Sequence, residues 1–241
     1  MRIRAVALGV LLATADPAAA QFTSSLGGTF NNPGSALLGT MIGNRLLADA
    51  ARKGAPRDGA TTPARPSSPG PAARTTFTPV ARNLMVKELA DTLVKDAAAR
   101  QELSAAFAGY LREFDEQARR DREPSNDVGR AAAFFVMVNY FAATGREPTD
   151  AQADGAQETF RAGLIDNPAF ARMGDRDRQR LYESLVILGS FPIAGVAQAE
   201  QARNAAQAKM FREFAGDLVK TLIGAPVEKI RLTTTGFRID E

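Results

Sequence analysis

The 241-residue sequence contains no cysteine and no histidine. Without cysteine the chain has no structural disulfides and no acylated cysteine of the kind that anchors bacterial lipoproteins, so stability must come from a packed core. The absence of both residue types also excludes Ser-His-Asp and Cys-His catalytic groups, zinc sites with imidazole or thiolate ligands, and haem held by histidine. Carboxylate, lysine, tyrosine and serine chemistry remains.

Recognised catalytic and cofactor motifs are missing as well. The sequence has no glycine-rich dinucleotide loop, P-loop, nucleophile elbow or Ser-x-x-Lys pair, so we expect no cofactor and assign no catalytic residue. One stretch approaches a calcium loop, with Asp150, Gln152, Asp154 and Gly155 at positions one, three, five and six. Arg161 occupies position twelve, where a bidentate glutamate is needed, so we expect a helix start and no metal site.

The C-terminal two thirds of the chain have almost no excess of charge of either sign. Residues 77–241 hold 22 basic and 24 acidic side chains, whereas residues 22–76 hold six basic and two acidic ones. Nucleic-acid-binding domains concentrate basic charge on one face, so we expect no nucleic-acid partner. The basic excess of residues 22–76 leaves peripheral contact with an anionic membrane surface as an open alternative.

The first 20 residues have the layout of a secretory signal peptide. Arg2 and Arg4 precede a mostly apolar stretch, and the small residues Ala18–Ala20 form a cleavage signal, so the mature chain is expected to begin at Gln21. This apolar stretch is shorter than the roughly 20 residues that span a bilayer. We therefore expect an exported protein, periplasmic or secreted, with no transmembrane span in the mature chain.

Two segments separate the signal peptide from the remainder. Residues 21–53 are expected to form a tail, in which apolar residues at near-helical spacing between 34 and 53 allow one short amphipathic helix. Residues 54–76 are rich in proline, glycine and small polar residues, a composition that cannot bury enough apolar surface to offset the entropy of ordering. We expect this segment to be a disordered linker.

From residue 77 onward the apolar spacing predicts one all-α domain, a single bundle of about six helices. Ser125, Asn126 or Asp127 can cap the third helix, and Gly145 ends it. A cluster of Gly189, Ser190, Pro192 and Gly195 is expected to break the helix that begins near Asp175. The weakly alternating C-terminus allows one or two short strands. Two further helices are expected near residues 83–95 and 97–121. The stretch "REPTDAQADG", residues 146–155, is expected to be a loop that leads to a helix with Ala156, Phe160 and Leu164 on its inner face. The stretch "DNPAF" is expected to start a short helical turn, and a long last helix ends at Gly224 and Pro226.

Two uncharged, apolar stretches mark the centre of the predicted bundle. They cover Ala131–Ala143 and Leu185–Ala197, each 13 residues long. Neither reaches spanning length, and a helix that is apolar all round in a soluble chain belongs in the core. We expect the two stretches to pack against each other, surrounded by amphipathic helices.

Four polar residues within or just before these stretches are the candidate binding residues: Asn139, Tyr140, Tyr182 and Glu183. A buried Asn139 amide must find partners, either across two helices or in a ligand pocket. Glu183, at the edge of an apolar run, is either a buried acid with a raised pKa or a side chain that pairs with arginine or reaches solvent. The mixed-charge stretches "EQARRDRE" and "DRDRQR" are interpreted as solvated helix faces.

Several stretches between residues 77 and 241 resemble a family of exported bacterial proteins known only as a domain of unknown function. They are "FTPVARNLM", "NDVGRAAAFFVMVNY", "NPAFARM", "LYESLVILG" and "KIRLTTTGF". The resemblance implies a helical exported domain and transfers no activity. It directs attention to the polar positions Asn126, Asp127, Asn139, Tyr140, Tyr182 and Glu183.

Three functions remain open at this point. We expect an exported, non-enzymatic binding or interaction module of the bacterial envelope, whose partner is a protein or a small apolar ligand. One alternative is a carrier that holds a small apolar ligand in a cavity between the two apolar helices. The other is a carboxylate-dependent hydrolase of envelope polymers, which requires an open cleft with two converging acids.

Overall fold

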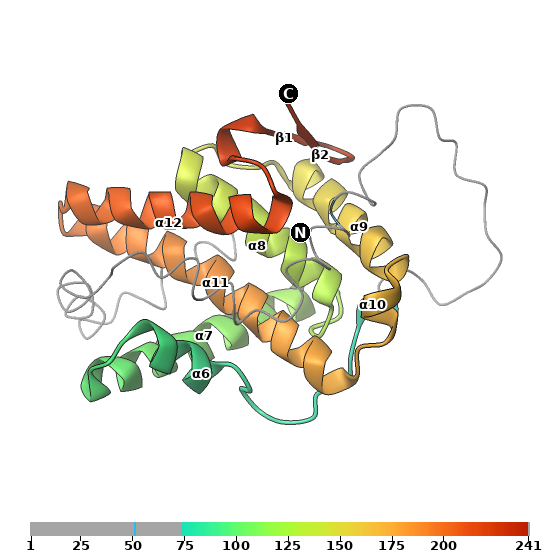
Figure 1. Ribbon diagram of the computed structural model, residues 1–241, viewed down its shortest axis with the longest axis horizontal. Coiled ribbons are helices and arrows are strands. Elements are labelled where there is room, and N and C mark those ends of the chain that lie inside the picture. Colours follow the sequence, from blue (N-terminus) through green and yellow to red (C-terminus); the bar gives the residue numbers. More distant parts are fainter. Residues whose placement is uncertain (1–50, 52–73, 241) are drawn as a thin grey trace.

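Helices account for most of the structure, a computed structural model that describes residue 51 and residues 74–240 (Figure 1). The predicted signal peptide, the tail apart from Ala51, and the linker up to residue 73 lie outside the described residues. The prediction of an all-α bundle is confirmed, with a small hairpin added at the C-terminus. The elements are α6 (Val86–Leu93), α7 (Ala97–Arg120), α8 (Val128–Thr144), α9 (Asp150–Ile165), the one-turn α10 (Pro168–Ala171), α11 (Asp175–Gln201), α12 (Ala205–Ile223), the 3-10 turn η1 (Val227–Lys229), β1 (Ile230–Thr233) and β2 (Gly236–Ile239).

Local sequence signals set several helix ends where they were predicted. Asp127 is the N-cap of α8, and its carboxylate accepts a hydrogen bond from the backbone N–H of Gly129 at 2.9 Å. Gly145 ends that helix with a φ of 69°, in the left-handed region that glycine enters without strain. Thr149 and Gln152 form a capping box at the start of α9, so the near-calcium stretch is a helix start. The loop predicted for residues 146–155 is therefore shorter, because α9 already begins at Asp150.

Helix α8 is the centre of the domain. It packs against α11, α12 and α9, and nearly all of its residues are buried. α11 crosses it diagonally, with α12 on one side and α6 and α7 on the other (Figure 1). The predicted pairing of the two apolar stretches is therefore confirmed, because α8 and α11 form the most extensive helix contact of the fold.

Helix α11 corrects the predicted break at Gly189–Gly195, because it runs without interruption from Asp175 to Gln201 with Pro192 inside it. Proline lacks the N–H that would bond to the carbonyl four residues earlier, here that of Leu188. The Asn139 side chain of α8 supplies a replacement, since its Nδ2 donates to the Leu188 carbonyl oxygen at 3.2 Å. A tertiary contact thus offsets the local signal for a break.

The glycines in α11 serve close packing. A Cβ atom placed on Gly189 would lie 3.2 Å from the Cα of Phe135 in α8, and one on Gly195 would lie 2.5 Å from the ring of Phe211 in α12. Both distances are shorter than ordinary van der Waals contact. At Gly189 the backbones of α8 and α11 therefore touch, which leaves no room for a ligand between them at that point.

Within the described part of the chain, α11 is the one helix long and apolar enough to cross a membrane, judged by length and composition. In the fold, 89% of the most apolar 18-residue stretch of this helix is buried inside the protein. It therefore has the position of a core helix.

Described residues before Phe77, the predicted domain start, also contact the domain. Thr75 is fully buried, and its hydroxyl donates to the Asp127 carboxylate at 2.6 Å. Thr76 forms an isolated antiparallel bridge with Asp127. Ala51 is helical and fully buried and belongs to the same hydrophobic core.

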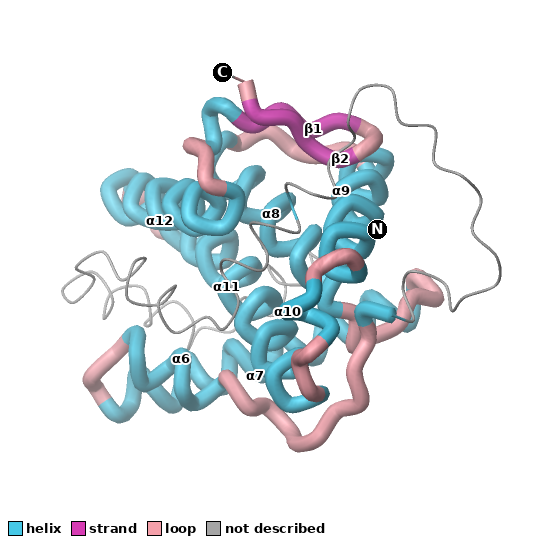
Figure 2. The backbone as a smooth tube through the Cα atoms, turned by 45° about the vertical axis from the view of Figure 1, so that its right-hand side comes forward, coloured by secondary structure: helices cyan, strands magenta, loops and turns pink. Residues whose placement is uncertain are grey.

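The predicted C-terminal strands form an antiparallel hairpin that lies on α9, at the opposite end of the domain from α6 and α7 (Figure 2). The contact is close at Gly155, where an added Cβ would lie 2.3 Å from the carbonyl oxygen of Thr234 in the hairpin turn. Gly155 thus serves helix–hairpin packing.

Candidate functional site

A pocket of about 300 Å³ opens between α7 and α11. Its outer wall is the segment 77–83 that leads into α6, and residues 125 and 126 close one end. Two of the four candidate residues, Tyr182 and Glu183 of α11, line it together with Gln179. We call this the α7–α11 pocket and treat it as the candidate site.

Two polar side chains of α11 hold the outer wall in place. The side chain of Gln179 accepts a hydrogen bond from the Val80 N–H at 2.9 Å and donates to the Ala81 carbonyl at 2.5 Å. Glu183 accepts from the Met85 N–H at 2.8 Å through one carboxylate oxygen and from Gln179 at 2.8 Å through the other. The wall is therefore fixed by buried side chains about 100 residues later in the chain.

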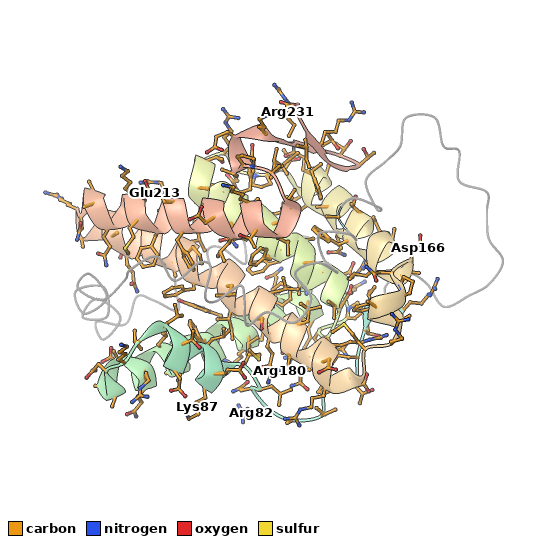
Figure 3. The ribbon with its side chains drawn as sticks, viewed as in Figure 1. Arg82, Lys87, Asp166, Arg180, Glu213 and Arg231 are labelled. Carbon is orange, nitrogen blue, oxygen red and sulfur yellow. The ribbon has the colours of Figure 1, made fainter. Side chains whose placement is uncertain are left out.

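Further contacts hold the two ends of this segment. Arg180 of α11 pairs with Glu88 of α6 at 2.8 Å (Figure 3). At the other end, Phe77 donates its N–H to the Asn126 carbonyl at 3.3 Å, and the Asn126 amide donates back to the Phe77 carbonyl. The pocket is preformed as a result.

Tyr182 forms the floor of the pocket. Its hydroxyl lies within hydrogen-bond reach of the Asp115 carboxylate on α7 and of the Ser125 carbonyl. The ring packs edge-on against Phe77 at 5.3 Å and also contacts Phe114. Burial, reinforced by the nearby Asp115 carboxylate, raises the pKa of Tyr182 well above its usual value, so the hydroxyl stays protonated and donates.

Two acids in the pocket have raised pKa values. Burial raises the pKa of Asp115, although the hydrogen bond from Tyr182 and the charge of Arg119 act against it. Burial also raises the pKa of Glu183, opposed by its hydrogen bonds from Gln179 and Met85. Raised carboxylate pKa values in a pocket are typical of functional sites, although buried structural acids share them.

The other two candidates, Asn139 and Tyr140, do not line the α7–α11 pocket. Asn139 is fully buried between α8 and α11, where its amide donates to the carbonyls of Phe135 at 2.9 Å and Leu188 at 3.2 Å. Tyr140 is buried farther along α8, within electrostatic range of Arg231 in the hairpin. Asn139 therefore has the structural role weighed for it, a hydrogen bond across two helices.

Part of the site lies in a stretch interpreted from sequence as a solvated helix face. In "DRDRQR" Gln179 is buried, and Arg178 donates to the Thr76 carbonyl at 3.1 Å. That interpretation is wrong for these two residues, because the extended segment before α6 covers this face of α11. Only the position of Gln179 four residues before Glu183 signalled that the two share a face.

Behind the pocket lies a buried ionic cluster that the sequence reading did not find. Arg161 of α9 contacts the fully buried Asp127 carboxylate at 2.6 Å and Glu123 at 2.6 Å. Nearby, the fully buried Arg130 pairs with Asp121 at 3.2 Å and lies over the Phe114 ring at 4.8 Å. Among the described residues, no group of three or more acids is placed to hold a metal ion.

The whole chain matches one family model. The match covers residues 1–240 and is to a family of unknown function, DUF6683. The protein belongs to this family. The match includes the 76 N-terminal residues that the resemblance noted above left out. No curated protein and no solved structure matches the chain.

Proposed function

We propose that this DUF6683 protein is an exported, non-enzymatic binding module of the bacterial envelope, and that its ligand binds in the α7–α11 pocket. The observation that carries the proposal is a preformed pocket of about 300 Å³ whose walls come from four parts of the chain. Pockets of this size, shaped by fixed polar groups, are typical of small-ligand sites. Export is supported by the signal-peptide layout of residues 1–20.

The acids of the pocket favour binding over hydrolysis. Both oxygens of Glu183 already accept hydrogen bonds from the protein, and one oxygen of Asp115 accepts from Tyr182. A general acid or base must instead reach the reacting group of the substrate. A carboxylate-dependent hydrolase stays the second candidate, because Asp115 and Glu183 line the same pocket. It predicts turnover of envelope polymers that Asp115→Asn abolishes.

The alternative of an apolar carrier has less support. It requires space between the two apolar helices, and at Gly189 their backbones are in contact.

Native mass spectrometry on protein gently purified from the envelope fraction tests the proposal. The mature chain should begin at Gln21 and carry a discrete added mass. Ala108→Trp places an indole in the pocket and should remove the added mass. Ala105→Trp, on an exposed position of the same helix, should leave it in place.

Two outcomes would count against the proposal. One is a bare chain in all three proteins. The other is an added mass that Ala108→Trp leaves unchanged. Retention of residues 1–20 and a cytoplasmic location would remove the exported part of the proposal while leaving the binding part standing.

A further inference from the structure

Three arginines line the α7–α11 pocket. Arg82 lies on the segment before α6 (Figure 3), and Arg112 and Arg119 lie two turns apart on α7. Within the described part of the chain, none of the three forms an ion pair with a carboxylate. Arg100 and Arg120, on the same helix but outside the pocket, do pair with acids, at 3.5 and 3.1 Å. The pocket therefore gathers three guanidinium groups that lack a contacting carboxylate among the described residues, although the charge of Arg119 acts on Asp115 from a distance.

The two acids of the pocket are engaged differently. Glu183 is fully occupied by the Met85 N–H and Gln179. Asp115 receives the Tyr182 hydroxyl on its Oδ1, and its Oδ2 has no hydrogen-bond partner among the described residues. One acceptor oxygen of Asp115 therefore lines the same pocket as three guanidinium groups that form no ion pair within the described residues.

A buried cation behind the floor adds to this field. Arg130 is fully buried, and its Nε and Nη1 atoms have no partner within the described part of the chain. Among the described residues it forms one ion pair, through Nη2 to Asp121 at 3.2 Å. Its charge acts on both Asp115 and Tyr182, and in a poorly solvated position such a charge is weakly screened.

From this arrangement we propose that the α7–α11 pocket binds a ligand that presents a carboxylate beside a hydrogen-bond donor. Arginine guanidinium groups pair with carboxylates through two parallel hydrogen bonds. The neighbouring donor, an amide N–H or a hydroxyl, would bond to Oδ2 of Asp115. The inference rests on the proposed function and names the class of its ligand. A peptide C-terminus and a sugar acid both carry this chemistry.

Titration calorimetry on the mature chain, residues 21–241, tests the assignment with four probes. Tri-alanine presents a carboxylate next to an amide N–H, and glucuronate presents one next to hydroxyls. Tri-alanine amide lacks the carboxylate, and inorganic phosphate lacks the neighbouring donor. We expect at least one carboxylate probe to bind at least tenfold more tightly than tri-alanine amide and phosphate. Tighter binding of tri-alanine would indicate a peptide C-terminus as the natural ligand, and tighter binding of glucuronate would indicate a sugar acid.

Matched arginine variants locate the binding. The double variant Arg112→Gln, Arg119→Gln should lower the affinity for the carboxylate probe at least tenfold. The double variant Arg100→Gln, Arg120→Gln should leave that affinity unchanged. All four positions are exposed or partly exposed, so both double variants should keep the helical circular dichroism of the parent. Equal affinity in the two double variants, or no binding of either carboxylate probe, would overturn the assignment.

This failure is distinguishable from failure of the proposed function. If the added mass of the envelope-purified protein disappears in Ala108→Trp but persists in the Arg112→Gln, Arg119→Gln variant, the pocket binds a ligand and the carboxylate assignment is wrong. If Ala108→Trp has no effect on that mass, the ligand does not bind in the α7–α11 pocket and the proposed function fails.

Discussion

At the scale of single residues, the pocket depends on polar side chains whose partners are far away in sequence. Glu183 could be chosen from sequence because it lies at the edge of an apolar run, and Tyr182 because of the family resemblance. Their partners Asp115 and Gln179 could not, because both lie in stretches with ordinary helix-surface composition. Amphipathic spacing says which side chains face inward, and it does not say which distant segment will cover them.

Asp115 should make stability depend on pH in a direction opposite to that of most acids. Burial raises its pKa above the ordinary 3.8, so the folded state holds the proton more tightly than the unfolded state. This stabilisation is complete below pH 3.8 and is lost as the pH rises through the raised pKa. The free energy of unfolding of the wild type, minus that of Asp115→Asn, should therefore increase as the pH falls from 7 towards 3.5.

Urea unfolding at a series of pH values measures this difference, and Asp91→Asn is an opposite-sign control. The pKa of Asp91 is lowered, mainly by its hydrogen bond with Lys87. The free energy of unfolding of the wild type, minus that of Asp91→Asn, should therefore decrease as the pH falls over the same range. If the difference between the wild type and Asp115→Asn also decreased as the pH fell, the expected effect of burial on Asp115 would be contradicted.

At the scale of elements, most helices follow from the sequence, and α11 does not. Glycine and proline are sound local signals for a break, and they fail here because two features outside the helix compensate. The Asn139 amide takes the place of the N–H that Pro192 lacks, and Phe135 and Phe211 fill the space that the glycines leave. Neither compensation is visible to a reading of residues 175–201 alone.

The pairing of Asn139 with Pro192 can be tested by a double-mutant cycle. Asn139→Ala should lower the free energy of unfolding by about 1–3 kcal/mol beyond the loss of packing, since it leaves the Leu188 carbonyl buried without a donor. In a Pro192→Ala background the restored N–H can bond to that carbonyl, so the same change should cost less. Chemical unfolding of the four proteins gives the coupling energy, which should exceed about 0.5 kcal/mol. Additive effects would show that the two residues act separately.

At the scale of the whole molecule, Arg161 of α9 links several distant parts of the sequence through one side chain. Its guanidinium contacts Asp127 at the start of α8 and Glu123 in the preceding loop. Asp127 in turn accepts a hydrogen bond from the hydroxyl of Thr75, 52 residues earlier in the chain. The sequence offered Arg161 only as the residue that disqualifies a calcium loop, because a buried ionic cluster has no periodic signature.

Replacing Arg161 by methionine should destabilise the protein strongly. The fully buried Asp127 carboxylate would lose its counter-ion, which typically costs about 3–5 kcal/mol. Arg120→Met is the matched control, because Arg120 is 54% exposed and its pairs with Glu113 and Glu116 should be worth about 1 kcal/mol or less. Urea unfolding measures both, and similar losses would show that burial adds nothing to the Arg161 pairs.

The outer wall of the pocket also sets the order of events during synthesis. Val80 bonds to a side chain 99 residues later, and Thr76 to one 102 residues later. A ribosome adds about 5–20 residues per second, so the wall waits roughly 5–20 s for its partners to emerge. Until then the segment has no template to lie on. The pocket therefore cannot close, and the chain cannot bind its ligand, before residues 178–183 of α11 have been made.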